Sequence, residues 1–262
     1  MRIVVCIKQV PASNDAKIDP ETKRIVREGS KAIINPFDLY AIEEAVRIRE
    51  QVGGEVIALT MGPEKAKAAL IEALSMGVDR AVLLSDRAFG GSDTWATSYV
   101  LARAIDAIGD VALILCGKQA VDGDTAQVGS GIAAKLDIQQ AANVWKVEQI
   151  DRQGITVRRM NERGWDVARL TYPALLTVVK DINTPRVPKL RDARAARMAE
   201  IPVWKPGDIG ADPDRIGLKN SPTQVVRTAP PAARSSNTLK IDCAPDAAAG
   251  RLVNELLKRE LL

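Results

Sequence analysis

The sequence contains no histidine in its 262 residues. This absence removes the commonest general base and the usual ligand of zinc and haem iron, and it excludes Ser-His-Asp and Cys-His catalysis. The three cysteines, Cys6, Cys116 and Cys243, lie far apart, so neither a disulfide framework nor an iron–sulfur cluster is expected. We therefore predict no catalytic side chain and no metal site, and any redox chemistry must use a bound organic cofactor.

Aromatic residues and excess charge are also scarce. Aromatics make up 3% of the chain and the formal net charge is +4, which argues against a stacking surface for single-stranded nucleic acid. The longest apolar runs are far shorter than the about 20 residues that a membrane-spanning helix needs, and no export signal is visible. We expect a cytoplasmic protein with no nucleic-acid partner and no direct membrane insertion.

Four short apolar runs alternate with helical patterns. The runs cover residues 2–7, 55–60, 80–84 and 111–116. Such runs are typical of strands covered on both faces, and their alternation with helices predicts a parallel sheet. We predict an open α/β sheet over residues 1 to about 138, extended by strands at 143–150, 155–161 and 166–179.

The composition changes after Lys180, where frequent prolines prevent long regular elements. Residues 247–261 still carry the pattern of an amphipathic helix. An extended arm that ends in such a helix is expected to pack on its own sheet or on a partner chain.

Ligands of open parallel sheets bind beyond the carboxyl ends of the strands, so the loops there are candidate sites. The third loop contains a glycine pair, a helix-capping residue and several hydroxyls, which together predict an anion site suited to a pyrophosphate. A flexible loop with an ordinary cap would explain the same residues. The candidate residues are Gly90, Gly91, Ser92, Asp93, Thr94 and Thr97.

Asn35-Pro36-Phe37-Asp38 predicts the start of a helix, because Asn is a good N-cap, Pro suits the first helical position and Asp complements the helix dipole. Helix capping alone would explain these residues.

The turn 116–131, CGKQAVDGDTAQVGSG, is too long for a simple chain reversal. It is not a Walker loop, and the glycines at 129 and 131 lie too far beyond their strand for a Rossmann fingerprint. Asp122 and Asp124 could accept hydrogen bonds from an amino group or a ribose hydroxyl. Nucleotide binding is favoured over turn formation alone.

Five motifs occur together along nearly the whole chain. They are Ile3-Val-Val-Cys-Ile-Lys-Gln-Val-Pro11, Ile34-Asn-Pro-Phe-Asp38, the turn described above, Lys180 to Leu190, and Trp204-Lys-Pro-Gly-Asp-Ile-Gly210. In this order they resemble the β subunit of electron-transfer flavoprotein, the family that includes FixA.

The resemblance implies a flavodoxin- or Rossmann-like α/β fold, a mostly parallel sheet with helices on both faces and an extended C-terminal arm. It also implies a heterodimer with an α subunit and a bound adenine nucleotide, which is AMP in simple members and a second FAD in electron-bifurcating members. The contacts it carries onto this chain are Cys6, Asn35, Pro36, Phe37, Asp38, Met61, Gly117, Lys118, Gln119, Ala120, Val121, Asp122, Gly123, Asp124, Thr125, Ala126, Gln127 and Val128.

Simple members lack the segment GGSDTWATS, whereas bifurcating and FixA-like members resemble this chain there, so FAD is favoured over AMP. The resemblance then implies that NADH reduces this FAD. One electron passes to a high-potential acceptor, an acyl-CoA dehydrogenase or an electron-transfer-flavoprotein–quinone oxidoreductase, and one passes to ferredoxin or flavodoxin. The alternatives are a simple electron shuttle that binds structural AMP and a stand-alone nucleotide-binding module without a redox role.

Leu190 matches the leucine by which family members dock onto acyl-CoA dehydrogenases, although a solvated basic helix is the other interpretation of residues 188–197. We expect residues 1–185 to form the nucleotide-binding domain. Residues 186–262 are expected to supply the partner-recognition loop and an arm that packs on the α subunit.

Overall fold

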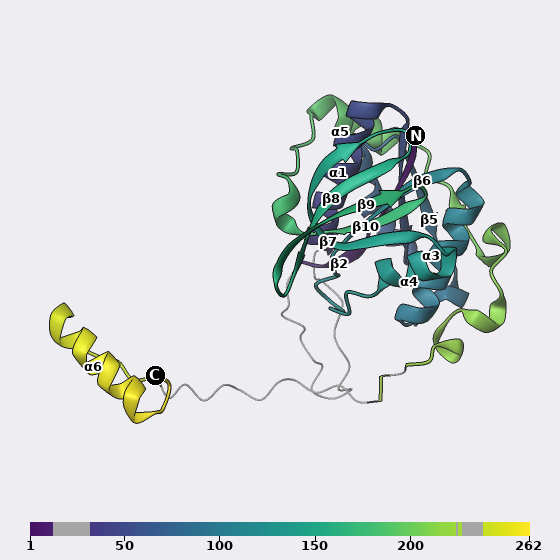
Figure 1. The fold of residues 1–262 in the computed structure, drawn as a ribbon. Helices are drawn as coiled ribbons and strands as arrows, with labels where there is room; N and C mark the ends of the chain where they lie inside the picture. The colour runs from purple at the N-terminus through teal and green to yellow at the C-terminus, as the bar shows by residue number, and fades with distance from the viewer. Residues whose placement is uncertain (13–31, 224, 227–237) are drawn as a thin grey trace. The chain divides into compact units, whose positions relative to one another are not determined.

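The computed structural model describes residues 1–12, 32–223, 225–226 and 238–262 (Figure 1). Its contacts divide the chain into two compact units, Met1–Val225 and Val226–Leu262.

In the described part of the first unit, nine strands form one sheet in the order β11-β5-β4-β1-β6-β10-β7-β8-β9. The strands are β1 (Arg2–Cys6), β4 (Glu55–Met61), β5 (Arg80–Leu84), β6 (Val111–Gly117), β7 (Gln139–Ile150), β8 (Gly154–Asn161), β9 (Gly164–Thr171), β10 (Ala174–Val178) and β11 (Val203–Trp204). All neighbours from β11 to β7 pair in parallel, whereas β7, β8 and β9 pair antiparallel. A separate antiparallel pair joins β2 (Gln9–Pro11) to β3 (Ala32–Ile34).

Helices cover both faces of this sheet (Figure 1). They are α1 (Pro36–Val52), α2 (Lys67–Ser75), α3 (Thr94–Ile108), α4 (Val128–Leu136) and α5 (Leu190–Met198). The side chains of β1 alternate between the two cores: Ile3 and Val5 pack with α1 and α2, and Val4 and Cys6 pack with α3 and α4. Because each face of the strand is buried, its sequence is a continuous apolar run. The predicted α/β fold class is confirmed.

The sheet order places a topological switch point at β1. The chain passes from β1 to β4 and β5 on one side, and it then returns to the other side of β1 to form β6. The connections that leave the carboxyl ends of β1 and β6 therefore diverge, which opens a crevice of the kind that holds ligands in such sheets.

The predicted single segment 166–179 is two strands in the structure. The chain turns at Tyr172 and Pro173 between β9 and β10. All five residues of β10 are buried, and the strand lies between β6 and β7. The apolar composition of β10 suits this central position, whereas β9 is largely exposed at the edge of the sheet.

Residues 203–223 run back over the first unit. β11 pairs with β5 at one edge of the sheet. Farther along, the N–H of Asp212 donates to Tyr99 Oη at 3.0 Å, and Arg215 lies 4.0 Å from the centroid of the same ring. This part of the chain therefore packs on α3.

The second unit contains α6 (Pro245–Lys258), which confirms the predicted C-terminal helix. Leu252, Val253 and Leu257 lie on α6 and are each about half exposed. Residues 227–237 of the predicted arm lie outside the described residues. Of the helices that the structure describes, none combines the length and the apolar character needed to cross a membrane.

Candidate functional site

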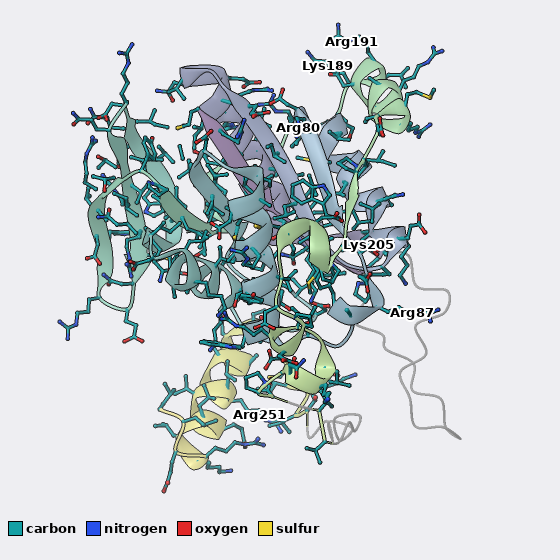
Figure 2. The ribbon with its side chains drawn as sticks, turned by 90° about the vertical axis from the view of Figure 1, so that its right-hand side faces the viewer. Arg80, Arg87, Lys189, Arg191, Lys205 and Arg251 are labelled. Atoms are coloured by element: carbon teal, nitrogen blue, oxygen red, sulfur yellow. The ribbon has the colours of Figure 1, made fainter. Side chains whose placement is uncertain are left out.

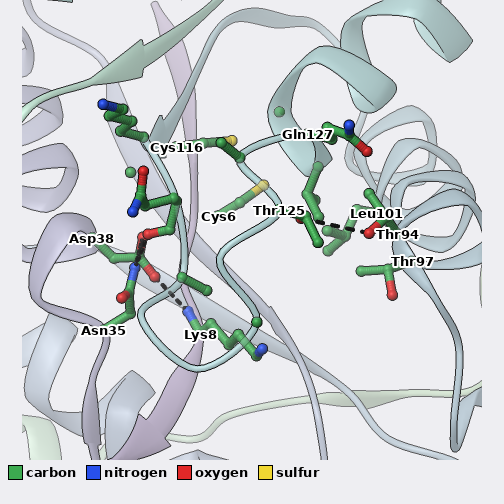
Figure 3. A pocket seen from close by; sticks show the side chains of 18 of the residues that line it. Cys6, Lys8, Asn35, Asp38, Thr94, Thr97, Leu101, Cys116, Thr125 and Gln127 are labelled. Carbon is green, nitrogen blue, oxygen red and sulfur yellow. Dashed lines mark hydrogen bonds between the residues drawn. The ribbon is translucent and has the colours of Figure 1, made fainter. Parts of the chain in front are cut away.

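A cavity of about 360 Å³ lies at the switch point, beyond the carboxyl ends of β1 and β6 (Figure 3). Its volume is within the range of small-molecule sites, about 300–1,000 Å³. The lining residues are Cys6, Ile7, Lys8, Asn35, Asp38, Met61, Ser92, Asp93, Thr94, Thr97, Leu101, Cys116, Gly117, Lys118, Gln119, Ala120, Gly123, Asp124, Thr125, Ala126, Gln127, Val128 and Gly129.

Asn35 joins the turn after β6 to the start of α1. Its buried Nδ2 donates to Gln119 O at 2.8 Å and to Asp38 Oδ1 at 2.9 Å. Its Oδ1 accepts from the N–H of Val121 at 3.1 Å. Asn35 stands at the N-cap position of α1 as predicted, but its side chain makes no capping hydrogen bond. The amide instead holds the turn against α1.

Asp38 is the most buried carboxyl group of the cavity. Its Oδ2 accepts from the N–H of Lys8 at 2.7 Å, and further hydrogen bonds come from Asn35 and from the backbone of Gly117. Burial raises the pKa of Asp38 from 3.8 to about 7, although these donors and the charge of Lys8 oppose the shift. The carboxyl thus ties the ends of β1 and β6 to α1.

The raised pKa of Asp38 predicts a stability that depends on pH. Because the folded pKa exceeds the unfolded one, the stabilisation by the bound proton is complete below about pH 4 and is lost as the pH rises through about 7. As the pH rises from about 5 to about 8, deprotonation of this group should lower the unfolding free energy by about 2–3 kcal/mol. Across this pH range the melting temperature should fall more steeply with rising pH for the wild type than for Asp38→Asn. Parallel declines would contradict the assignment.

The turn from Gly117 to Gln127 is held by charged and polar contacts at its tip. Lys8 Nζ lies 2.6 Å from Asp122 Oδ1, and Gln119 Nε2 donates to Asp124 Oδ1. Asp124 has a φ of 54°, in the left-handed region that non-glycine residues enter rarely. The turn is therefore shaped by specific contacts and has a strained backbone position beside the cavity.

The first turn of α4 borders the cavity with uncapped backbone. Gln127 is at its N-cap position and makes no side-chain capping bond, while Val128 and Gly129 line the cavity. A Cβ at Gly129 would lie 2.6 Å from Thr177 Cγ2, and one at Gly131 would lie 2.7 Å from Ser98 Oγ. The two glycines thus let α4 pack closely on β10 and α3. The N–H groups at this helix start are suited to binding an anion.

Gly90 and Gly91 do not line the cavity. The N–H of Gly90 donates to Arg87 O at 3.0 Å, and a Cβ at Gly91 would lie 2.8 Å from the Cβ of Leu218. Gly91 therefore permits close packing of Leu218. This differs from the expectation that the pair presents free N–H groups to an anion.

Asp93 caps α3. Its Oδ1 accepts from the N–H of Ala96 at 3.0 Å, and its Oδ2 accepts from the N–H and hydroxyl of Thr223 at 2.9 and 2.8 Å. Because a carboxyl group already caps this helix start, we assign ligand binding in this region to the hydroxyl-bearing residues Thr94 and Thr97, which line the cavity.

The structure brings most of the predicted site residues into one place. The predicted residues that do not line the cavity are Pro36, Phe37, Gly90, Gly91, Val121 and Asp122. The lining residues that were not predicted are Ile7, Lys8, Leu101, Cys116 and Gly129. Leu101 follows Thr94 by seven residues and Thr97 by four, so helical periodicity could have found it. Lys8 and Cys116 lie at the carboxyl ends of strands, where ligands of open parallel sheets bind, so their positions could have identified them.

Leu190 lies outside the cavity, at the start of α5. It is 88% exposed, and Figure 2 shows its sequence neighbours Lys189 and Arg191 projecting outward at α5. The segment before α5 is anchored by Arg186, whose guanidinium lies 2.8 Å from Glu43 and 2.7 Å from Glu50 on α1. The predicted docking residue is thus presented on a segment that is fixed to the sheet domain.

Comparisons with known proteins agree with this architecture. A family model described as "Electron transfer flavoprotein domain" matches residues 22–209. The chain is 48% identical over 232 residues to "Electron transfer flavoprotein subunit beta" of Thermoanaerobacterium thermosaccharolyticum, with 88% of each chain covered. It is 45% identical to "Caffeyl-CoA reductase-Etf complex subunit CarD" of Acetobacterium woodii over the full length of both chains. It is also 45% identical to "Protein FixA" of Azorhizobium caulinodans, covering 99% of this chain and 95% of the relative. The chain therefore belongs to the electron transfer flavoprotein family, as an electron-transfer protein of the β-subunit and FixA type.

Proposed function

We propose that this chain binds FAD in the cavity at the ends of β1 and β6 and that, paired with an α subunit, it takes electrons from NADH for electron bifurcation. The observation that carries this proposal is the extent of the cavity. One continuous space reaches from Asn35 and the turn after β6 to Thr94 and Thr97 on α3. A mononucleotide would need fewer of these contacts than a dinucleotide.

The donors around the cavity fit a pyrophosphate and an adenosine. The uncapped start of α4 offers backbone N–H groups to the phosphates, and Lys8 and Lys118 add positive charge nearby. Hydroxyls of Thr94 and Thr97 lie at the other end of the cavity. Asp124 can accept hydrogen bonds from ribose hydroxyl groups.

Bound FAD would supply the redox chemistry, accepting two electrons from NADH and passing one to a high-potential acceptor and one to ferredoxin or flavodoxin. The side chains described above bind and orient the cofactor. Asn35 and Asp38 keep the turn after β6 closed on α1, which fixes the floor of the cavity. No acid or base from the protein is required for electron transfer.

A second candidate function is a simple electron shuttle that binds AMP. The observation that favours it is the cavity volume of about 360 Å³, which is close to the lower limit for ligand sites. A stand-alone nucleotide-binding module without a redox role does not agree with the family to which the chain belongs.

The proposed partners bind to the part of the chain that follows the nucleotide-binding residues. We assign residues 1–185 to nucleotide binding and 186–262 to partner recognition, with the apolar side of α6 packing on the α subunit. Leu190, exposed beside basic residues, would anchor an acyl-CoA dehydrogenase or a quinone oxidoreductase. The relative CarD is named as a subunit of a caffeyl-CoA reductase-Etf complex, which supports a partner of this class. The proposed location is the cytoplasm.

Replacing Thr94 and Thr97 with valine tests the FAD site. Among the described residues their hydroxyls make only long contacts, 3.5 Å to Thr125 Oγ1 and 3.4 Å to Ser92 O, so the fold should depend little on them. If they bind FAD, its affinity should fall by about 1–3 kcal/mol for each lost hydroxyl partner. Flavin content and Kd of the co-purified heterodimer measure this effect.

The matched control is Thr171→Val, an exposed β9 residue that does not line the cavity. This variant should keep its flavin. Equal flavin content and Kd in the double variant and the wild type would remove the start of α3 from the proposed site.

A further inference from the structure

Cys6 and Cys116 form a pair of neighbouring thiols in the wall of the cavity. They are register partners on the adjacent parallel strands β1 and β6. Both belong to the core on the α3 and α4 side of the sheet, so their side chains project from the same face. Figure 3 shows the two sulfur atoms close to one another.

The backbone geometry of this pair permits a disulfide. Neighbouring strands lie about 4.8 Å apart, and disulfides join Cα atoms that are about 4.4–6.8 Å apart. Cys6 is also the largest influence on the pKa of the Cys116 thiol, as expected for two neighbouring sulfur atoms. Closing the bond would therefore require side-chain rotation and little movement of the strands.

The pair is buried but can be reached through the cavity. Cys6 is 8% exposed and Cys116 is 6% exposed, and both line the cavity. The hydrogen bond with Cys6 and burial raise the pKa of the Cys116 thiol well above its usual range. Attack by the Cys116 sulfur on an oxidant is therefore disfavoured.

We propose that Cys6 and Cys116 are a modification site at which a hydroperoxide forms an intramolecular disulfide. The Cys6 sulfur attacks the peroxide, the O–O bond breaks, one water leaves, and Cys6 becomes a sulfenic acid. The Cys116 sulfur then attacks the Cys6 sulfur, the S–S bond forms, and the sulfenic oxygen leaves as a second water. Two thiols lose two electrons and two protons in total, and one hydrogen peroxide is reduced to two waters.

The test uses the full chain with Cys243→Ser, because Cys243 is exposed and would form bonds between molecules. After treatment with hydrogen peroxide and quenching, intact-mass analysis should show the loss of two hydrogen atoms. Peptide mapping without reduction should find Cys6 joined to Cys116, and a reductant should reverse the change. None of these readouts depends on flavin, so the result is independent of the proposed function.

Two further variants in the same background test the order of the steps. With Cys116→Ser, Cys6 should be trapped as a sulfenic acid that a dimedone probe labels. The protein that retains both Cys6 and Cys116 should give almost no such label. With Cys6→Ser, Cys116 should remain a free thiol. Exposed Cys243 of the wild type serves as the positive control for the oxidant. The proposal is overturned if both thiols of the pair stay free, or if they oxidise separately without the Cys6–Cys116 bond, while Cys243 reacts.

Discussion

Replacing Gly117 with alanine should lower the unfolding free energy by about 1–3 kcal/mol or more and should empty the nucleotide cavity. A Cβ at this position would meet Asp38 Oδ1 and would lie 2.8 Å from the carbonyl carbon of Phe37. Neither neighbour can move freely, because Asp38 is held by three donors and Phe37 belongs to the backbone of α1. Denaturant titration and the nucleotide content of the purified heterodimer measure the two effects.

Gly207→Ala is the matched control, because it adds the same methyl group at a residue that does not line the cavity. Apart from its near neighbours in the chain, no atom of the described residues lies within 4 Å of a Cβ there. This variant should keep both its stability and its nucleotide. If the two variants behave alike, close packing of the end of β6 against α1 does not shape the site.

Replacing Asn35 with aspartate should have an effect of similar size. The change removes the Nδ2 donor that serves Gln119 O and Asp38 Oδ1, and it places a second carboxyl group beside buried Asp38. Each polar group left without a partner costs about 1–3 kcal/mol, and two carboxyl groups at such close range disfavour ionisation of both. We expect the turn after β6 to detach from α1 and bound nucleotide to be lost.

Hydrogen exchange of the Val121 amide and nucleotide content report this detachment directly. Asn161→Asp is the control, because Asn161 Oδ1 accepts from the N–H of Arg163 at 2.7 Å and a carboxylate can do the same. If Asn35→Asp retains its nucleotide and its Val121 protection, Asn35 does not hold the turn.

The fold and the place of the site could be predicted from hydrophobic pattern and topology. Continuous apolar runs such as 2–7 indicated strands buried on both faces, and the switch-point rule located the site at their carboxyl ends. The insertion of β10 between β6 and β7 could not be read in this way, because local pattern does not specify which strands become neighbours in a sheet.

The roles of individual polar residues were harder to predict, because they depend on contacts between distant segments. Asn35 has the sequence context of a helix cap. Its side-chain amide instead forms hydrogen bonds with the backbone of Gln119 and Val121, which lie 84 and 86 positions farther along the chain. Gly90 and Gly91 have the context of an anion-binding loop, yet Leu218, which is distant in the sequence, packs against Gly91 and donates its N–H to Gly90 O. Local rules identify the residue types that a turn or cap can use, and tertiary packing decides between those uses.

The most direct test of the account is to identify the nucleotides released on denaturing the heterodimer of this chain with its α subunit. The account predicts about two FAD per heterodimer, one of which is lost in the Gly117→Ala variant of this chain. One FAD with one AMP would contradict the assignment of FAD to this cavity. One FAD with no other adenine nucleotide would contradict the central claim that the loops at the ends of β1 and β6 bind an adenine cofactor.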